Sequence, residues 1–556
     1  MNVDRRQPPE TVPPPGDVIR HPTRGGAGHS LVAALSLVFL LHAAPAWAGM
    51  KPAAIFGNDM VLQCDRPLPV WGWADPGDEI AITFAGQTRT ARAAPDGAWR
   101  ITLDRLSVSA EPRVMVIRSK IENRETKIEG ILVGEVWLCS GQSNMGLSLR
   151  DCFDAPREIA AADFPRFRFF VVPGGGAPVP APDIGGGKWR VCTPETAADF
   201  AGTAYFFGRA LHRELKTPVG LIEFDRGSTG IEGWIPLAGC RESPAPALQA
   251  MYHEAARWDP RSDIGRQAHT EAFAAIDAWL PAAKAALSAG KPVPPEPLLP
   301  APSRQIPGPT TIFNGILHPL VPFAIRGATW YHGEANPGEG AIYEQKLKAM
   351  ITGWRAAWGQ GDFPFYFVQL ANEGNTVIRP MEEESFRYVP VREAQRRALE
   401  LPHTGMAVAI DLGEDASGHP RNKQDVGERL ARWALANTYN RKVPFSGPLY
   451  RSFSITGDTV VLRFDHVGSG LMVGDKNGLD PVHAVTNGVL GQFAIAGGDG
   501  TWHWADARIA GRTVEVRSDR VPVPVKVRYA YSMNPKGGKL YNREGLPASP
   551  FRTDDW

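Results

Sequence analysis

The feature that most constrains this chain is an apolar run that ends abruptly in a turn of small and polar residues. Residues 131–139 read ILVGEVWLC, and their β-branched and large apolar side chains predict a buried strand. Residues 140–145 follow as SGQSNM. A glycine beside a serine in a tight turn exposes a hydroxyl at the carboxyl edge of a sheet, where the ligand sites of open α/β sheets lie. The run therefore predicts a strand that presents a serine at such an edge.

The string VWLCSGQSNM (136–145) resembles the first sequence block of the SGNH (GDSL-like) esterases, in the form carried by the sialate O-acetylesterase family. In that form the serine after Gly-Gln is the nucleophile, which corresponds here to Ser143. Three further stretches resemble the same family, namely NDMVLQ (58–63), RNKQDVGERL (421–430) and LYNREGLPASPF (540–551). The resemblance spans nearly the whole chain after residue 48 and implies a carboxylic ester hydrolase.

The 556 residues are enough for several domains. Short strand patterns without helical periodicity predict a β-sandwich-like domain at 49–127. For residues 128–440 the resemblance implies a flavodoxin-like SGNH hydrolase domain with a parallel sheet, and the Ala-rich and Pro-rich residues 242–309 predict an excursion from it. Residues 441–556 return to strand patterns. The expected fold class is therefore α/β, with an N-terminal and a C-terminal β-rich domain flanking the hydrolase domain.

The strands expected in the central sheet lie at 131–139, 219–224, 324–331, 363–370 and 406–410. A base for the serine is expected at His419, which lies in a Gly-His-Pro turn after the last of these strands. A serine hydroxyl is a poor nucleophile without a base that accepts its proton. Because Ser143 and His419 both follow predicted strands, both can lie at one carboxyl edge of the sheet. The turn also resembles the His-Pro block of the esterase family.

The acid that orients this histidine stays open on the sequence alone. The family usually places an aspartate three residues before the histidine, but that position is Ala416 here. Asp415 is the favoured candidate, since the turn that follows it is small and flexible, and Asp411 and Glu414 are alternatives. A further alternative is a Ser–His dyad whose imidazole is held by a backbone carbonyl.

Hydrogen-bond donors are also needed for the oxyanion of a tetrahedral intermediate. The backbone N–H groups of Ser143 and Gly227 are candidates, because glycine admits a close approach of the backbone to a substrate. Asn336 ends the stretch WYHGEAN (330–336), which resembles the third family block, so it is a candidate for a side-chain donor.

Four more polar residues are expected to line or brace the cleft as substrate-binding residues, and they are Gln142, Asn144, His332 and Glu334. His332 is a rival base, but it stands where relatives carry glutamine, which favours a polar structural role. The third block also departs from the family form at Ala335, where relatives carry serine.

The N-terminal residues 1–48 carry the pattern of a signal peptide. Arg20 and Arg24 precede the apolar residues 31–41, and AWA at 46–48 gives the small-x-small motif of a cleavage site. The apolar run is too short to span a bilayer as a mature helix. Cleavage after residue 48 is expected, which predicts a periplasmic or secreted protein, and the long head before the run leaves the translation start open.

Charge and motifs argue against several other classes. The formal charge is +1, so neither a nucleic-acid partner nor stable membrane insertion of the mature chain is expected. The sequence has no H-E-x-x-H motif, no ligand-spaced His–carboxylate cluster and no phosphate loop, so no metal or other cofactor is expected. The five cysteines are odd in number and define no disulfide pairing, and the oligomeric state stays open.

The resemblance thus implies an exported serine esterase that removes O-acetyl groups from a sugar through an acetyl-serine intermediate. The expected activity is that of a sialate O-acetylesterase, with an acetylated carbohydrate as its substrate. An acetylesterase acting on xylan or another polysaccharide is the alternative. A second alternative is a carbohydrate-binding protein with weakened catalysis, because His332, Ala335 and Ala416 depart from the family pattern.

Overall fold

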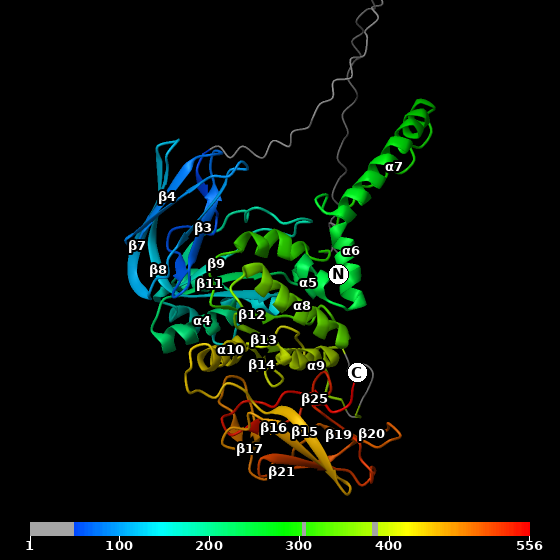
Figure 1. Ribbon diagram of the computed structural model, residues 1–556. Helices are drawn as coiled ribbons and strands as arrows, with labels where there is room; N and C mark the ends of the chain where they lie inside the picture. Colours follow the sequence, from blue (N-terminus) through cyan, green and yellow to red (C-terminus); the bar gives the residue numbers. More distant parts are fainter. Residues whose placement is uncertain (1–48, 303–306, 378, 381–386, 556) are drawn as a thin grey trace, which may run out of the picture. The chain divides into compact units, whose positions relative to one another are not determined.

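The computed structural model describes residues 49–302, 307–377, 379–380 and 387–555 (Figure 1). The predicted signal peptide, residues 1–48, lies outside the described residues. The described chain is a mixed α/β protein in which one large mixed sheet is joined by additional β-rich regions. The expected α/β class is thereby confirmed.

The central part of the large sheet has the strand order β10-β9-β11-β8-β12-β13-β14. All neighbours in this order run parallel except the edge pair β10 and β9. Strands β11-β8-β12-β13-β14 have the order 2-1-3-4-5 of a flavodoxin-like sheet. The strands are β8 (Arg124–Gly141), β9 (Phe164–Val171), β10 (Trp189–Cys192), β11 (Val219–Asp225), β12 (Gly327–Tyr331), β13 (Phe365–Gln369) and β14 (Thr404–Val408).

Helices cover both faces of this sheet, which is why its parallel strands read as continuous apolar runs. The α-helices of the described chain are α1 (Ser143–Gly146), α2 (Ala155–Ala160), α3 (Pro194–Ala197), α4 (Gly202–Leu215), α5 (Leu237–Glu242), α6 (Pro246–Ala256), α7 (Asp263–Ser288), α8 (Ala341–Trp358), α9 (Val389–Arg397) and α10 (Lys423–Asn437). Helices α4 and α10 pack against each other on one face, and α8 packs with α5 and α9 on the other (Figure 1).

Two tryptophans show how the faces are filled. Trp137 of β8 is level with Gly327 of β12, so Trp137 and Trp330 point to opposite faces of the sheet. Trp137 packs against Phe207 of α4 with ring centroids 5.2 Å apart. Trp330 packs edge-on against Trp354 of α8 with centroids 5.8 Å apart. Large aromatic side chains therefore anchor both helical layers to adjacent central strands.

The N-terminal β region contains two sheets. Strands β1, β3 and β6 form an antiparallel sheet, while β5, β4 and β7 pair in that order with β8, and β2 runs parallel to β8. Strand β8 thus continues from this region into the central sheet, across the predicted domain boundary at residue 127. The bounds are β1 (Lys51–Pro52), β2 (Val61–Gln63), β3 (Leu68–Trp73), β4 (Glu79–Phe84), β5 (Gln87–Arg92), β6 (Ala98–Leu103) and β7 (Ser109–Ser119).

The C-terminal β region has a buried apolar cluster of its own. Its sheets have the orders β15-β16-β22-β21, β18-β17-β24 and β20-β19-β23-β25. The strands are β15 (Leu449–Thr456), β16 (Thr459–Asp465), β17 (Leu471–Asp475), β18 (His483–Ala484), β19 (Phe493–Ala496), β20 (Trp502–Trp504), β21 (Asp506–Ala510), β22 (Thr513–Arg517), β23 (Lys526–Tyr529), β24 (Leu540–Asn542) and β25 (Phe551–Arg552).

All five cysteines are buried and carry free thiols, and they are Cys64, Cys139, Cys152, Cys192 and Cys240. Among the described helices, none combines the length and the hydropathy that a membrane crossing requires.

Candidate active site

The fold brings Ser143 and His419 together, although 276 positions separate them in the sequence. The Nε2 atom of His419 lies 2.7 Å from the Oγ atom of Ser143, which is a hydrogen-bonding distance. Ser143 begins α1 directly after β8, and His419 lies in the loop between β14 and α10. Both side chains therefore come from segments that follow parallel strands, as the sequence predicts.

The backbone at Gly141 explains how the turn before Ser143 is formed. Gly141 has φ +150°, and an added Cβ would lie 2.1 Å from the carbonyl oxygen of Tyr331, so only glycine fits. Strand β8 can therefore pair with β12 up to its last residue. The N–H of Gln142 then donates to the Tyr331 carbonyl at 3.0 Å, which fixes the turn against β12.

The loop after β11 borders the same hydroxyl. A Cβ added to Gly227 would lie 3.5 Å from the Cβ of Ser143, so the Gly227 backbone is next to the serine. The N–H of Arg226 donates to the Gly141 carbonyl at 3.1 Å, which ties this loop to the end of β8. Within the described chain, the N–H groups of Ser143 and Gly227 donate to no other group. Both N–H groups are therefore candidates for donors to an anionic oxygen bound to Ser143.

Asn144 is a buried hydrogen-bonding centre beneath the pair. Its Nδ2 atom donates to the Gly418 carbonyl at 2.8 Å and to Oε1 of Glu334 at 2.6 Å. Its Oδ1 atom accepts from Nζ of Lys423 at 2.6 Å. The residue after Ser143 is thus bonded to the residue before His419, which fixes the spacing of the two reactive side chains.

Lys423 was missed by the sequence reasoning. Its side chain is buried at the first turn of α10, and this burial lowers its pKa to about 8. Its ammonium lies 5.0 Å from the centre of the Tyr331 ring, and the nearby Glu334 carboxylate favours the charged form. Burial also raises the pKa of Glu334. A lysine at a helix start usually faces solvent, so no pattern in the sequence marked this one.

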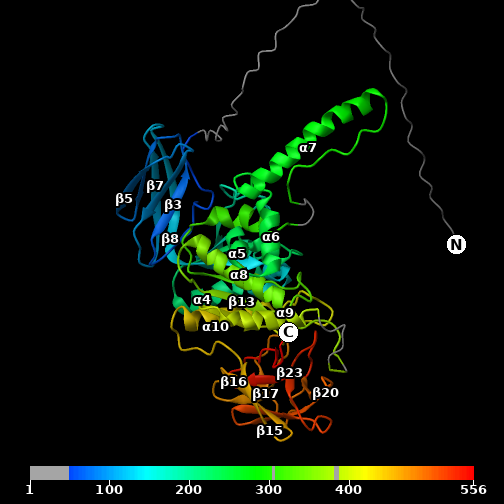
Figure 2. The same cartoon turned by 45° about the vertical axis from the view of Figure 1, so that its right-hand side comes forward.

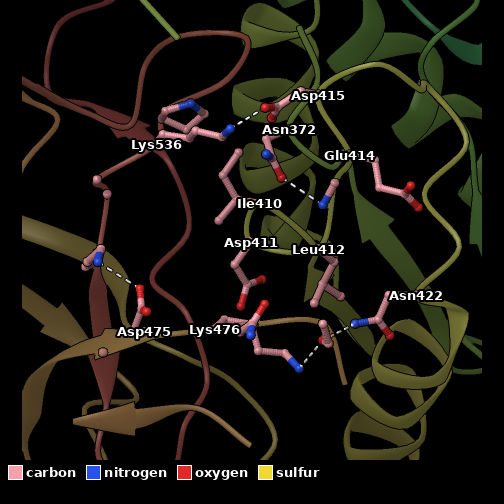
Figure 3. Close-up of a pocket in the computed structure, with 18 of the residues that line it drawn as sticks. Asn372, Ile410, Asp411, Leu412, Glu414, Asp415, Asn422, Asp475, Lys476 and Lys536 are labelled. Carbon is pink, nitrogen blue, oxygen red and sulfur yellow. Dashed lines mark hydrogen bonds and ion pairs between the residues drawn. The ribbon is translucent and has the colours of Figure 1, made fainter. Parts of the chain in front are cut away.

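Asp415, the favoured orienting acid, does not reach His419. Its Oδ1 atom accepts from Nδ2 of Asn534 at 2.8 Å, and its exposed carboxylate forms an ion pair with Lys536 (Figure 3). The hydrogen bond and ion pair with Lys536 lower its pKa. These partners hold the carboxylate away from the imidazole, which corrects the expectation that the small turn would let it swing to the ring.

The two alternative acids are engaged elsewhere as well. Asp411 forms a bidentate ion pair with Arg429, with N–O distances of 2.6 and 2.8 Å. Glu414 accepts from the backbone N–H of Arg421 at 2.7 Å. Within the described chain, Nδ1 of His419 makes no hydrogen bond, so the structure shows a Ser–His pair without an attached carboxylate.

Within the described residues, Asn336 is hydrogen-bonded to the segment after β11 and to Glu339, and not to Ser143. Its Oδ1 accepts from the N–H of Ile231 at 2.9 Å, and its Nδ2 donates to Glu232 at 3.0 Å and to Glu339 at 3.2 Å. Both amide protons are thereby used, so this side chain braces the loop after β11 and has no free donor for an oxyanion. The expected oxyanion role of Asn336 is corrected accordingly.

His332 is fully buried and does not line the cavity that holds Ser143 and His419, so its contacts indicate the structural role rather than the expected substrate-binding one. Its Nε2 atom lies 2.7 Å from the Thr229 carbonyl, and its Nδ1 atom lies 3.1 Å from the Tyr343 hydroxyl. Its ring is stacked between those of Trp330 and Tyr343. Complete burial lowers its pKa to about 4.

The Ser143–His419 pair opens into a cavity of about 400 Å³. Its other walls come from Gln142, Asn144, Ser228, Glu334, Ala335, Pro337, Tyr388 and Gly418. Glu373 was also missed by the sequence reasoning, and its two carboxylate oxygens lie 3.3 Å from where a Cβ on Gly418 would be. Among the described residues, no group of three His, Cys, Asp or Glu side chains is placed to hold a metal ion.

A larger cavity of about 740 Å³ is lined by residues 410–416 of the loop that leads to His419. Figure 3 shows that residues 410–415 form one wall and that Asp475, Lys476 and Lys536 approach from the C-terminal β region. Its charges are largely paired, for example Asp475 with Lys539 at 2.8 Å and Lys476 with Asp425 at 2.6 Å. The cavity is therefore lined by polar groups that are held in place from both the His419 loop and the C-terminal β region.

The pKa of His332 predicts how stability depends on pH. Between pH 6.5 and about 4 the unfolded chain binds a proton at this ring and the folded chain does not, so the free energy of unfolding falls as pH falls. His332→Gln removes the titrating group. Its unfolding midpoint should therefore drop less than that of the wild type between neutral pH and pH 5, as followed by circular dichroism. Exposed His483→Gln is the control and should behave like the wild type; equal acid sensitivity in all three proteins would contradict the assignment.

Comparison with known proteins shows which sequences this chain is similar to. A family model described as "Carbohydrate esterase, sialic acid-specific acetylesterase" matches residues 316–436. Sialate O-acetylesterase from Homo sapiens is 29% identical over 465 residues, which cover 75% of this chain and 77% of that protein. The counterpart from Mus musculus is 27% identical over 460 residues, or 75% of this chain and 79% of that protein.

A solved structure is also similar to this chain in its fold. The crystal structure of a carbohydrate acetylesterase from Xanthomonas citri is similar with a TM-score of 0.73 and 33% identity, covering 91% of this chain and 100% of that chain. This chain belongs to the sialate O-acetylesterase family of carbohydrate esterases and is a carboxylic ester hydrolase.

Proposed function

We propose that this enzyme removes O-acetyl groups from a carbohydrate through an acetyl-serine intermediate at Ser143. The observation that carries the proposal is the 2.7 Å contact between Ser143 Oγ and His419 Nε2, in a cavity at the carboxyl edge of the parallel sheet. Such a pair supplies the nucleophile and the general base that attack on an ester requires. Membership of a family of carbohydrate esterases supports the choice of an acetylated sugar as the substrate.

In the first half-reaction, Ser143 Oγ attacks the acetyl carbonyl carbon while His419 Nε2 accepts the hydroxyl proton. The negative charge that develops on the carbonyl oxygen is stabilised by the N–H groups of Ser143 and Gly227. The tetrahedral intermediate then breaks its bond to the sugar oxygen, and His419 gives its proton to that oxygen. The products are the deacetylated sugar and acetyl-Ser143.

In the second half-reaction, a water molecule attacks the acetyl carbon while His419 Nε2 takes one of its protons. The same N–H groups stabilise the second tetrahedral intermediate. Its collapse breaks the bond to Ser143 Oγ, which recovers its proton from His419, and acetate is released as its acid. In both steps Nε2 acts as the base, so the neutral ring carries its proton on Nδ1.

His419 is positioned through its backbone in this proposal. Its N–H donates to the Ser417 hydroxyl at 3.1 Å, and the preceding Gly418 carbonyl is held by Asn144 at 2.8 Å. Lys423 and Glu334 in turn fix the orientation of the Asn144 amide. We therefore assign to Asn144 the positioning role that a carboxylate plays in a triad, and favour the dyad.

The departures from the family pattern do not argue for lost catalysis. His332 replaces a glutamine, yet it is buried and holds the Thr229 carbonyl. Ala416, where relatives carry the orienting aspartate, is exposed on the loop wall. Neither of these two positions contacts the Ser143–His419 pair within the described chain. The third departure, Ala335, lines the cavity, and the Ser143–His419 contact of 2.7 Å is formed beside it, so an active esterase is favoured over a weakened binding protein.

The natural sugar is the finer part of the proposal. A sialate is favoured by the family, whereas an acetylated polysaccharide such as xylan is favoured by the 740 Å³ cavity beside the His419 loop. Ala416 lines that cavity and is three residues from His419, so at most about 11 Å of backbone separates the two sites. Comparing kcat/KM on acetylated sialic acids and acetylated xylo-oligosaccharides decides between them, and turnover of neither would refute both.

Export to the periplasm or the medium is proposed on the signal-peptide pattern of residues 1–48. Mass spectrometry of the mature protein should find an N-terminus near Gly49. Recovery of the exported protein with residues 31–41 intact would refute cleavage.

Replacing the nucleophile should abolish turnover. Ser143→Ala is expected to lower kcat on a chromogenic acetyl ester by several orders of magnitude with an unchanged fold, because only binding and oxyanion contacts remain. Ser140→Ala is the matched control, since its buried hydroxyl donates to the Phe224 carbonyl at 2.6 Å and lies away from the cavity. Loss of activity in Ser140→Ala but not in Ser143→Ala would show that the wrong serine has been assigned.

Neutralising Asp415 should cost little. Asp415→Asn is expected to reduce kcat/KM by less than about tenfold, because its carboxylate contacts Asn534 and Lys536 rather than the imidazole. Glu414→Gln on the same loop is the control. A loss near 10⁴-fold in Asp415→Asn alone, the size expected for a triad aspartate, would reinstate the triad and overturn the dyad.

A further inference from the structure

Helix α7 leaves an apolar stripe in solvent. This 26-residue helix buries only Gly265, Ala268 and Ala283, and in both views it extends away from the central sheet (Figures 1 and 2). An Ala-rich helix in such a position gains little from contact with the rest of the chain. Its exposed apolar side chains are therefore a candidate interaction surface.

The stripe consists of Phe273, Leu280 and Leu287, which are 55%, 41% and 71% exposed. They recur every seven residues, and at 3.6 residues per turn each lies within about 20° of the one before. The stripe is thus a single line about 21 Å long on one side of the helix.

The chain itself covers a different side of α7. The Pro-rich segment after α7 returns along it, and Nε1 of Trp279 donates to the Pro294 carbonyl at 3.0 Å. Ile276 and Ala283, on this covered side, are less exposed than the stripe. The described chain therefore contributes a cover for one flank of α7 and leaves the stripe open.

Two opposite charges lie beside the stripe. Asp277 follows Phe273 by four residues and Lys284 follows Leu280 by four, so both lie about 40° from the stripe on the same side. Within the described chain, neither forms an ion pair. They are seven residues apart, or about 10.5 Å along the helix, which is too far for them to pair with each other.

We propose that the stripe binds the same stripe of a second copy of this chain, with the two α7 helices antiparallel and a two-fold axis near Leu280. In this register Phe273 faces Leu287 of the second copy, and Leu280 faces Leu280. Asp277 then faces Lys284 of the second copy, and Lys284 faces Asp277. One arrangement therefore buries every stripe residue and pairs every flanking charge, as an isologous interface requires.

Charge decides the direction of the pairing. In two parallel α7 helices related by a two-fold axis, the side of one copy that carries Asp277 and Lys284 would lie across the interface from the same side of the other copy, so neither charge would have a partner. Only the antiparallel arrangement gives two opposite-charge contacts. The inference concerns assembly and stands apart from the proposed reaction, because α7 contributes no residue to the cavity of Ser143.

Sedimentation velocity of the mature full-length chain tests the proposal, over a concentration range of roughly a hundredfold. The wild type should show a reversible monomer–dimer equilibrium. Leu280→Glu, which places two like charges at the axis, should weaken the dimer at least about tenfold without loss of esterase activity. Glu271→Lys is the control, since residue 271 lies about 160° round the helix from Phe273 and should not affect association.

Charge reversal tests the register itself. Asp277→Lys and Lys284→Asp should each weaken self-association, because each creates a like-charge contact across the axis. An equal mixture of these two variants should form a mixed dimer, and the double variant D277K/K284D should regain self-association. A wild type that stays monomeric throughout, a dimer that persists in Leu280→Glu, or reversals without effect would overturn the proposal. Binding of α7 to lipid vesicles by a monomeric wild type would point to a different occupant and would also overturn it.

Discussion

The central position of β8 between β11 and β12 is the constraint on which the site depends. Backbone pairing holds Gly141 level with Asp225 and with Tyr331, so three parallel strands end together. Ser143 and Gly227 follow two of these ends within two residues. The sheet therefore delivers the nucleophile and its neighbouring backbone to one place. His419 comes from a later loop and needs a second constraint, which the bond from Asn144 to the Gly418 carbonyl supplies.

The sequence predicts those parts of the molecule whose signal is local. Every residue of β12 and β13 is buried, because helices cover both faces of the sheet, and such strands read as apolar runs. In β4, burial alternates along the strand, and apolar side chains alternate with others in its sequence, so this strand could also be predicted. Ser143 and His419 were predictable for a related reason, since each stands in a short turn directly after or shortly beyond a strand and in a stretch that resembles the esterase family.

Side-chain partnerships across the chain were not predictable in this way. Asp415 stands near His419 in sequence, yet its partners Asn534 and Lys536 come 119 and 121 residues later. Lys423 faces the core although it begins a helix, because Asn144 and the Tyr331 ring lie beneath it. Periodicity and spacing report which face of an element is buried, but they do not report which distant loop supplies the partner of a polar group.

Covalent catalysis at Ser143 is most directly tested by quenched-flow mass spectrometry. The enzyme would be mixed with excess activated acetyl ester, quenched in acid within the first turnovers and mapped by peptide. An acetyl group should appear on the peptide that contains Ser143, should localise to that serine, and should disappear once the ester is consumed. Steady turnover with no acetyl group on Ser143, or with the acetyl group on another side chain, would contradict the mechanism.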